Sequence, residues 1–299
     1  MHRRIRSDGF TAGEALILVL VLVFAAAIIL PMLARVRSIP NGRTCGVNLA
    51  GIGKSMLVYA NDYEGEFPRA STRDSSWAAR TPNWLGNDRH EAFEIGPDGS
   101  GGRASISASL YLLVKYAELV PAQFLCFDRN GRVEKGAREF RLDEYGIRDR
   151  RLTDVWDFGP NPPQHCSYAY HMVYGPHRLT VSSEPGVPIA ADRNPWMDSP
   201  SAKAKDFSRF KPDVSPFSGT AEQGHHGNAI GHEARGQNVL FQDTHVAFEK
   251  RPYCGVDSDN IYTSWDGRDK IRGQPPKLGS QPADAKDSLL VNDPPVPRK

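Results

Sequence analysis

The amino-acid sequence predicts an α+β fold that begins with a long N-terminal helix and continues into a globular part built from short strands. Three observations carry this prediction. Residues 15–34 are apolar and uncharged, apolar residues recur at intervals of three and four from Cys45 to Tyr63, and short strand patterns follow later in the chain. We therefore expect a helix with a membrane half and an amphipathic half.

Length and composition exclude several classes of protein. The chain has 299 residues, of which 39% are hydrophobic, and this is enough for a real core. Its 37 Lys and Arg residues nearly balance 35 Asp and Glu residues, so the net charge of +2 provides no broad field for binding nucleic acid. The four cysteines form no CxxC pair, which argues against a zinc ribbon.

The apolar segment at residues 15–34 reads ALILVLVLVFAAAIILPMLA. A helix of this length, rising about 1.5 Å per residue, would cover the roughly 30 Å hydrocarbon core of a membrane. The alternative is a cleaved secretory signal, but the apolar part of such a signal usually has about 7–15 residues. We therefore expect a transmembrane helix over residues 10–37.

The residues before the apolar segment resemble the type IV prepilin signal. Residues 1–9 form a short basic leader, MHRRIRSDG, which Phe10 and Glu14 follow. The resemblance implies that a prepilin peptidase cuts between Gly9 and Phe10 and methylates the new amino terminus. It also implies that Glu14 meets the methylated terminus of a neighbouring subunit and that Pro31 distorts the helix.

Two of these residues have a physical interpretation of their own. Glu14 would be the one charge inside the membrane segment, where a carboxylate is costly unless it is paired or neutralised. Pro31 removes a backbone donor and loosens the helix, or alternatively ends it. The resemblance further implies a single pass through the inner membrane, with the globular domain in the periplasm or otherwise outside the cytoplasm.

Later helices follow from periodicity and turn residues. Residues 38–42 contain Pro and Asn-Gly and predict a break. The amphipathic helix that carries Cys45 should end between Asn61 and Gly65. A second short helix is expected over residues 109–116.

The rest of the chain predicts short strands and long connections. Residues 69–103 are expected to form a long surface loop, and the Pro-rich residues 273–299 a disordered tail. The predicted strands are residues 122–127, 167–173, 186–191, 237–241 and 245–248.

The last two of these strands predict a hairpin. Asp243 and Thr244 would form its turn, where glycine would fit more easily than Thr244 because such turns need positive φ. This stretch resembles the prepilin-type processing-associated His-x9-Asp-Gly domain, and the resemblance covers nearly the whole chain up to the tail. The signature residues of this chain are His232, Asn238, Asp243 and His245.

The two resemblances together imply a pilin-like fold, in which the long N-terminal helix packs on an antiparallel β-sheet with long loop insertions. The expected divisions are a leader at residues 1–9, the transmembrane helix at residues 10–37, an extracytoplasmic globular domain at residues 38–272 and the tail at residues 273–299.

Several side chains are candidate metal ligands. Imidazole and carboxylate groups suit zinc, although the chain has no HExxH helix and no nucleophile paired with a base. Asp257 and Asp259 invite calcium but lack the Gly and distal Glu of an EF-hand, and the other interpretation is that all these groups hydrogen-bond loops. We expect no enzyme and no cofactor, with calcium as the alternative. The candidates are His225, His226, His232, Asp243, His245, Asp257 and Asp259.

The four cysteines permit three disulfide connectivities if the domain lies in an oxidising compartment. Of these we favour a pair between Cys126 and Cys166. Cys45 lies on the apolar helix face, where a buried free thiol is equally reasonable.

The function that these observations predict is structural. We expect a pilin-like or pseudopilin subunit for a type II secretion or type IV pilus-like filament of a bacterial envelope. Its partners would be a prepilin peptidase, other pilin-like subunits and the inner membrane, with no nucleic acid. The alternative is a non-assembling, membrane-anchored, extracytoplasmic ligand-binding protein whose loop at residues 69–103 carries specificity.

Overall fold

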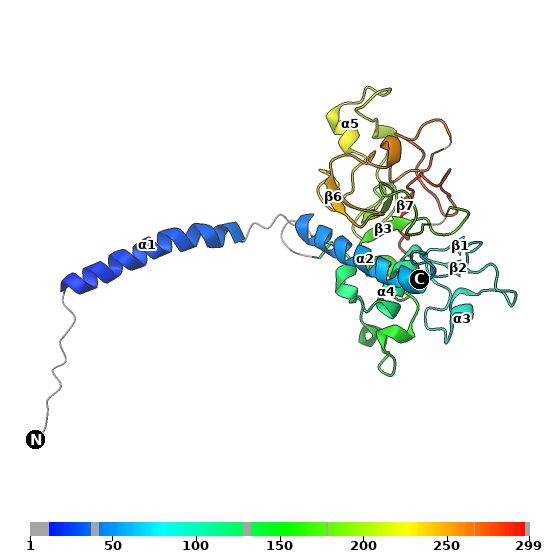
Figure 1. Cartoon of the computed structure of the whole chain (residues 1–299), viewed down its shortest axis with the longest axis horizontal. Helices are drawn as coiled ribbons and strands as arrows, with labels where there is room; N and C mark the ends of the chain where they lie inside the picture. Colours follow the sequence, from blue (N-terminus) through cyan, green and yellow to red (C-terminus); the bar gives the residue numbers. More distant parts are fainter. Residues whose placement is uncertain (1–11, 37–41, 128–132, 178, 266, 297–299) are drawn as a thin grey trace, which may run out of the picture. The chain divides into compact units, whose positions relative to one another are not determined.

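The chain divides into two compact units, Met1–Pro40 and Asn41–Lys299 (Figure 1). The computed structural model describes residues 12–36, 42–127, 133–177, 179–265 and 267–296, with the backbone alone for residues 26–36 and 42–43.

The first unit contains helix α1, Ala12–Val36. Its side chains are described as far as Ala25. No helix among the described residues is both long and apolar enough to cross a membrane. The predicted membrane-spanning helix is therefore wrong, and with it the membrane assignment and the single-pass inner-membrane localisation.

The predicted long N-terminal helix, and the pilin-like fold class built on it, are also wrong. Helix α1 ends at Val36, and a separate helix, α2 (Gly42–Asp62), belongs to the second unit. The sequence between them contains Pro40, which lacks a backbone N–H and disfavours a helical conformation of the residue before it. The predicted break at residues 38–42 lies outside the described residues except for Gly42, where α2 begins.

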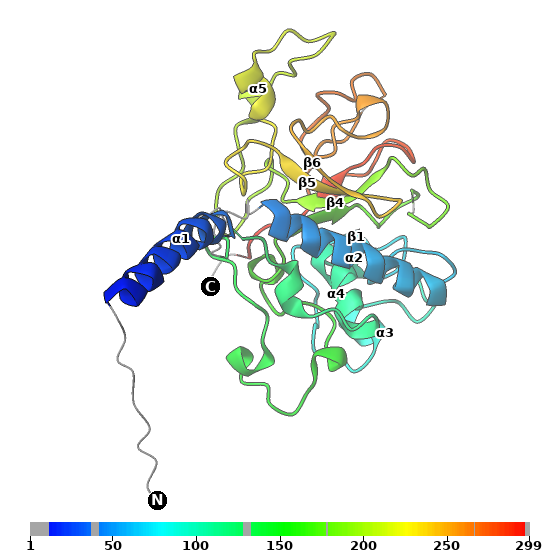
Figure 2. The same cartoon turned by 60° about the vertical axis from the view of Figure 1, so that its left-hand side comes forward.

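Helix α2 buries the face that the three-and-four spacing predicts. It lies between the sheet and helix α4, Ile106–Tyr116 (Figure 2). The sheet can approach closely because α2 carries Gly53, where a Cβ atom would lie 2.7 Å from Leu240 Cδ1. The buried residues of this face, each at most 6% exposed, are Cys45, Leu49, Ile52, Met56 and Tyr59.

The sheet of the second unit has five antiparallel strands in the order β6-β5-β4-β3-β7. Strands β3, β4, β5 and β6 arise where the sequence predicts strands, although their ends differ by one or two residues in β3, β4 and β6. The strands are β3 Tyr168–His171, β4 Pro188–Asp192, β5 Gln237–Phe241, β6 Val246–Glu249 and β7 Leu290–Val291.

Strand β7 corrects the prediction of a disordered tail. Leu289, Leu290 and Val291 are completely buried, and β7 pairs with β3. The buried Asp293 carboxylate accepts hydrogen bonds from Trp77 Nε1 at 2.9 Å and from the backbone N of Ile106 at 2.8 Å. The Pro-rich composition of the tail conceals this short apolar segment, which the sheet edge and α4 hold in place.

Two further predictions need correction. Residues 122–127 are not a strand, because Pro121 starts a 3₁₀ helix, η1, Pro121–Phe124. Residues 69–103 are not a surface loop throughout, since Ser71, Trp77 and Phe93 are buried. The aromatic side chains of Trp77 and Phe93 supply apolar surface that packs into the core.

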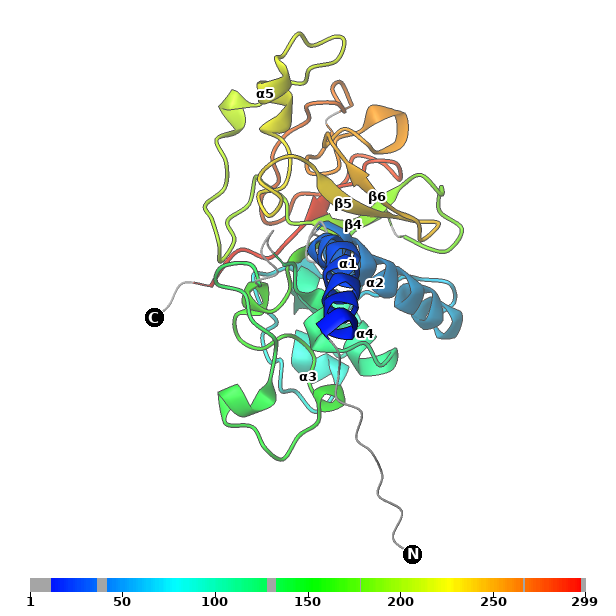
Figure 3. The same cartoon turned by 90° about the vertical axis from the view of Figure 1, so that its left-hand side faces the viewer.

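The remaining elements are short. Helix α5, Ala221–His225, and helix α4 lie on opposite sides of the sheet (Figure 3). Strands β1 and β2 form a separate parallel pair. Their bounds are β1 Ser76–Trp77, β2 Arg103–Ala104, α3 Arg89–Phe93, α5 Ala221–His225, η2 Leu142–Tyr145, η3 Leu152–Asp154, η4 Pro162–Gln164, η5 Phe207–Arg209 and η6 Val256–Ser258.

Candidate metal centre

The hairpin of β5 and β6 is present and begins close to two signature residues. Asn238 lies in β5, and His232 lies in the loop that leads into it. At the turn, the Thr244 backbone N donates to Phe241 O at 2.9 Å, and Thr244 takes a φ of 70°. The expectation that a glycine would fit better at this position therefore has a structural basis.

Four side chains from distant segments meet beside this hairpin. Cys45 lies near the start of α2, Cys126 follows η1, Asp192 ends β4, and His232 precedes β5. One ligand atom of each lies within 4.8 Å of the others. No other group of three or more His, Cys, Asp or Glu side chains is placed to hold a metal ion in the part of the chain that the structure describes.

The distances within this cluster are short. Cys126 Sγ lies 2.6 Å from Cys45 Sγ and 3.8 Å from both Asp192 Oδ1 and His232 Nε2. His232 Nε2 lies 3.0 Å from Asp192 Oδ2. All four groups are shielded from solvent, and the most exposed side chain, that of His232, is 9% exposed.

Asn238 orients the carboxylate of the cluster. Its backbone N donates to Asp192 Oδ2 at 2.6 Å, and its side-chain Nδ2 donates to the same oxygen at 3.0 Å. Asn238 Nδ2 also lies 3.1 Å from His232 Nε2. The signature asparagine thus holds two of the four groups in position, as an outer partner does around a metal ligand.

The cluster shifts the pKa values of its members. The hydrogen bond with Cys126 lowers the pKa of the Cys45 thiol to about 6, although burial opposes this change. The same hydrogen bond, together with burial, raises the pKa of the Cys126 thiol. Burial opposes the charged form of His232, but the negative charge of Asp192 raises the pKa of this imidazole to about 10.

Only His232 of these four residues is among the ligands that the sequence predicts. The favoured pair of Cys126 with Cys166 is wrong, because the neighbour of Cys126 is Cys45 and all four cysteines are free. No local spacing could indicate the cluster, since Cys45 and Cys126 are 81 positions apart. The one available signal in the sequence is that Cys45 lies on the apolar face of a predicted helix and that Cys126 follows the helix predicted over residues 109–116.

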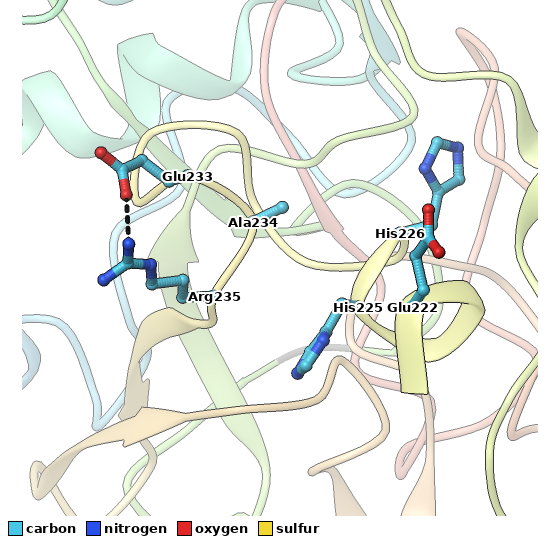
Figure 4. Close-up of a pocket in the computed structure, with 6 residues that line it drawn as sticks. All are labelled: Glu222, His225, His226, Glu233, Ala234 and Arg235. Atoms are coloured by element: carbon cyan, nitrogen blue, oxygen red, sulfur yellow. Dashed lines mark ion pairs between the residues drawn. The ribbon is translucent and has the colours of Figure 1, made fainter. Parts of the chain in front are cut away.

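The predicted histidine pair does not converge on a common point. His225 and His226 line a surface cavity of about 300 Å³, and their side chains point in different directions (Figure 4). His226 Nε2 lies 3.0 Å from the backbone O of Asp206. At the other side of this cavity, Glu233 pairs with Arg235 at 2.9 Å.

Asp243 and His245 lie at the far end of the hairpin. His245 Nδ1 lies 2.5 Å from Asp243 Oδ1, and both side chains are exposed. The His245 ring stacks on Phe241 with a centroid distance of 4.4 Å. These contacts order the turn, and the pair stands apart from the cluster around His232.

The two candidate calcium ligands point to different partners. Asp257 lies 3.4 Å from Lys270 Nζ, whereas Asp259 is buried and accepts a hydrogen bond from the Ser288 backbone N at 2.8 Å. Burial raises the pKa of Asp259 to about 7, which disfavours the charged form that calcium requires. These contacts are structural.

The predicted processing and assembly residues lie in the first unit. Gly9 and Phe10 fall outside the described residues. Glu14 lies in the first turn of α1, where a negative charge interacts favourably with the helix dipole. Helix α1 continues through Pro31 to Val36, so this proline does not end it.

Comparisons of the chain with protein-family models, with curated proteins and with solved structures give no match. The assignment to a prepilin-type family therefore stays a prediction that rests on the motifs of the chain itself.

Proposed function

We propose that this chain is a pilin-like subunit, cut between Gly9 and Phe10 by a prepilin peptidase and assembled with other pilin-like subunits into a type II secretion or type IV pilus-like filament. The proposal rests on the leader motif and on one structural observation. That observation is the apolar surface of α1.

Nine consecutive large apolar side chains of α1, residues 16–24, are exposed. Their exposed fractions run from 52% at Leu18 to 71% at Phe24. Since successive residues of a helix turn by about 100°, this run covers the whole circumference of the helix. A helix that is apolar on every side is stable when other apolar surface surrounds it.

Equivalent helices of neighbouring subunits supply such a surface. Covering residues 16–24 would contribute on the order of 10 kcal/mol per subunit, at about 25 cal/mol per Å² of apolar area. Glu14 lies just before this run, and in the assembly it would pair with the positively charged amino terminus of Phe10 in the next subunit. The apolar run would thus provide affinity, and the charge pair the axial register.

Processing is tested by intact-mass and N-terminal analysis of the full chain extracted from the cells that produce it. A chain that starts at methylated Phe10 supports the proposal. A chain that starts at Met1, or beyond Ala34, contradicts it.

Assembly is tested with two matched cysteine variants, Val21→Cys in α1 and Val181→Cys in the second unit. Both valines are exposed, at 60% and 47%. If α1 helices pack together, a short thiol cross-linker should give a covalent dimer with Val21→Cys, since each introduced thiol can join one neighbour, and no dimer above that of the unmodified chain with Val181→Cys. Equal dimer yields in the two variants, or no dimer with Val21→Cys, would contradict the proposal.

Glu14→Leu adds a test of register. If Glu14 pairs with the next subunit, this variant should be processed but should no longer enter filaments that can be sheared and pelleted. Glu14→Asp, which keeps the charge, should retain part of the incorporation. Full incorporation of Glu14→Leu would refute the role of this carboxylate.

A further inference from the structure

The cluster beside the hairpin has the composition of a zinc site. It offers two thiols, one imidazole and one carboxylate, from Cys45, Cys126, His232 and Asp192. Thiolates and imidazole are the ligands that zinc prefers, whereas calcium and magnesium require oxygen ligands. The donor set therefore points to zinc.

The distances from Cys126 to Asp192 and His232 suit a tetrahedral ion, whereas two other separations are shorter than such an ion requires. Given bond lengths of about 2.3 Å to sulfur and about 2.0 Å to nitrogen or oxygen, neighbouring ligand atoms lie roughly 3.3–3.8 Å apart. Cys126 Sγ lies 3.8 Å from both His232 Nε2 and Asp192 Oδ1, and His232 Nε2 lies 3.0 Å from Asp192 Oδ2. The two sulfur atoms, 2.6 Å apart, would have to separate by about 1 Å.

Charge and surroundings also suit a divalent cation. Two thiolates and a carboxylate would place three negative charges in a buried position, and a divalent ion largely offsets them. The Phe127 backbone N donates to Cys45 Sγ at 3.4 Å, and Asn238 donates twice to Asp192. These donors are the outer hydrogen bonds that orient metal ligands.

We propose that Cys45, Cys126, Asp192 and His232 bind one zinc ion in a closed, structural site. With four protein ligands the ion has no open position for substrate, which distinguishes it from a catalytic zinc. The site joins α2, the segment after η1, β4 and the hairpin, and it closes loops of 81 and 106 residues. Its role is to hold α2 against strands β4 and β5 of the sheet.

Zinc content of the full chain tests this proposal. The chain is purified in mild detergent under reducing conditions, dialysed and analysed by plasma mass spectrometry. We expect about one zinc ion per chain, and a loss of roughly tenfold or more in His232→Ala. Cys254→Ser is the matched control for a cysteine outside the cluster and should keep its zinc.

A second variant separates ligand loss from misfolding. His232→Cys supplies another zinc ligand at the same position and should retain zinc. The cobalt(II) form should show thiolate charge-transfer absorption and the intense visible bands of a tetrahedral ion, and Cys126→Ser should weaken both. A chain without bound zinc, or unchanged zinc in His232→Ala, would overturn the proposal. The proposal would also be overturned if Cys45 and Cys126 were joined in a disulfide, which would give an intact mass two hydrogens below that of the fully reduced chain.

Discussion

The C-terminal segment offers the sharpest test of the structure, because its composition predicts disorder and its contacts predict a structural role. Leu289, Leu290 and Val291 are completely buried, and Asp293 accepts hydrogen bonds from Trp77 and from the start of α4. Burying each apolar side chain contributes about 1.5–3 kcal/mol. Each hydrogen bond to the carboxylate adds about 1.5–3 kcal/mol.

Removal of residues 289–299 should therefore cost about 10 kcal/mol, which is comparable with the whole stability of a typical domain. We expect the truncated chain to lose cooperative unfolding. The milder variant Leu290→Ala should lower the free energy of unfolding by about 3 kcal/mol. At an m-value of about 3 kcal/mol per M, its urea midpoint should fall by roughly 1 M.

The assay is urea unfolding of the full chain, followed by tryptophan fluorescence and circular dichroism. Leu278→Ala is the matched control, because Leu278 lies in the same tail but is 53% exposed. Its midpoint should change little. Equal midpoints for Leu290→Ala, Leu278→Ala and the unmodified chain would show that the tail is disordered and would refute the argument.

Three further predictions concern the second unit. Gly53→Ala should lower the free energy of unfolding by about 1 kcal/mol, because the new Cβ would lie 2.7 Å from Leu240 and this overpacking outweighs the gain in helix propensity. Gly51→Ala in the same helix is the control, and its gain in helix propensity should raise the free energy of unfolding by up to about 1 kcal/mol. Thr244→Gly should stabilise by about 1 kcal/mol, since it relieves a φ of 70°. Burial raises the pKa of Asp157 to about 7, so stability should fall as the pH rises from about 4 to 7, and Asp157→Asn should flatten this slope.

Thermal and urea midpoints check all three. A stabilising Gly53→Ala would mean that α2 does not approach the sheet as closely as the structure places it. A destabilising Thr244→Gly would contradict strain at the turn. For Asp157 the sign follows from the order of ionisation: the unfolded chain releases the proton first, so ionisation favours unfolding above the ordinary pKa of 3.8. If the unmodified chain became more stable between about pH 4 and pH 7 while Asp157→Asn did not, the raised pKa of Asp157 would be refuted.

Elements that depend on local pattern were predicted well. The apolar face of α2 was evident from its three-and-four spacing, since each side chain of that face recurs once per turn. Strand β5 has the predicted bounds, because turn residues enclose a short apolar run. The resemblance to the His-x9-Asp-Gly domain predicts Asn238 and His232 as signature residues, and the two side chains lie together at the candidate metal centre.

Elements that depend on distant contacts were missed. Three of the four proposed zinc ligands, Cys45, Cys126 and Asp192, escape prediction from the sequence, because the residues between them give no regular spacing. Strand β7 has two residues, too few for a periodic pattern, and it forms because the edge of β3 is available. The single long N-terminal helix is wrong because α1 and α2 are separate helices that belong to different units.

The sequence by itself determined the leader that resembles a prepilin signal, the apolar character of α1, the buried face of α2 and the hairpin, because each is encoded within about twenty neighbouring residues. The tertiary structure decided which cysteines are neighbours, which histidine meets a buried carboxylate, and that the tail completes the sheet. Those outcomes follow from the packing of segments up to 216 positions apart, as between Trp77 and Asp293. No local pattern records such packing, because the free energy comes from burial shared between the segments.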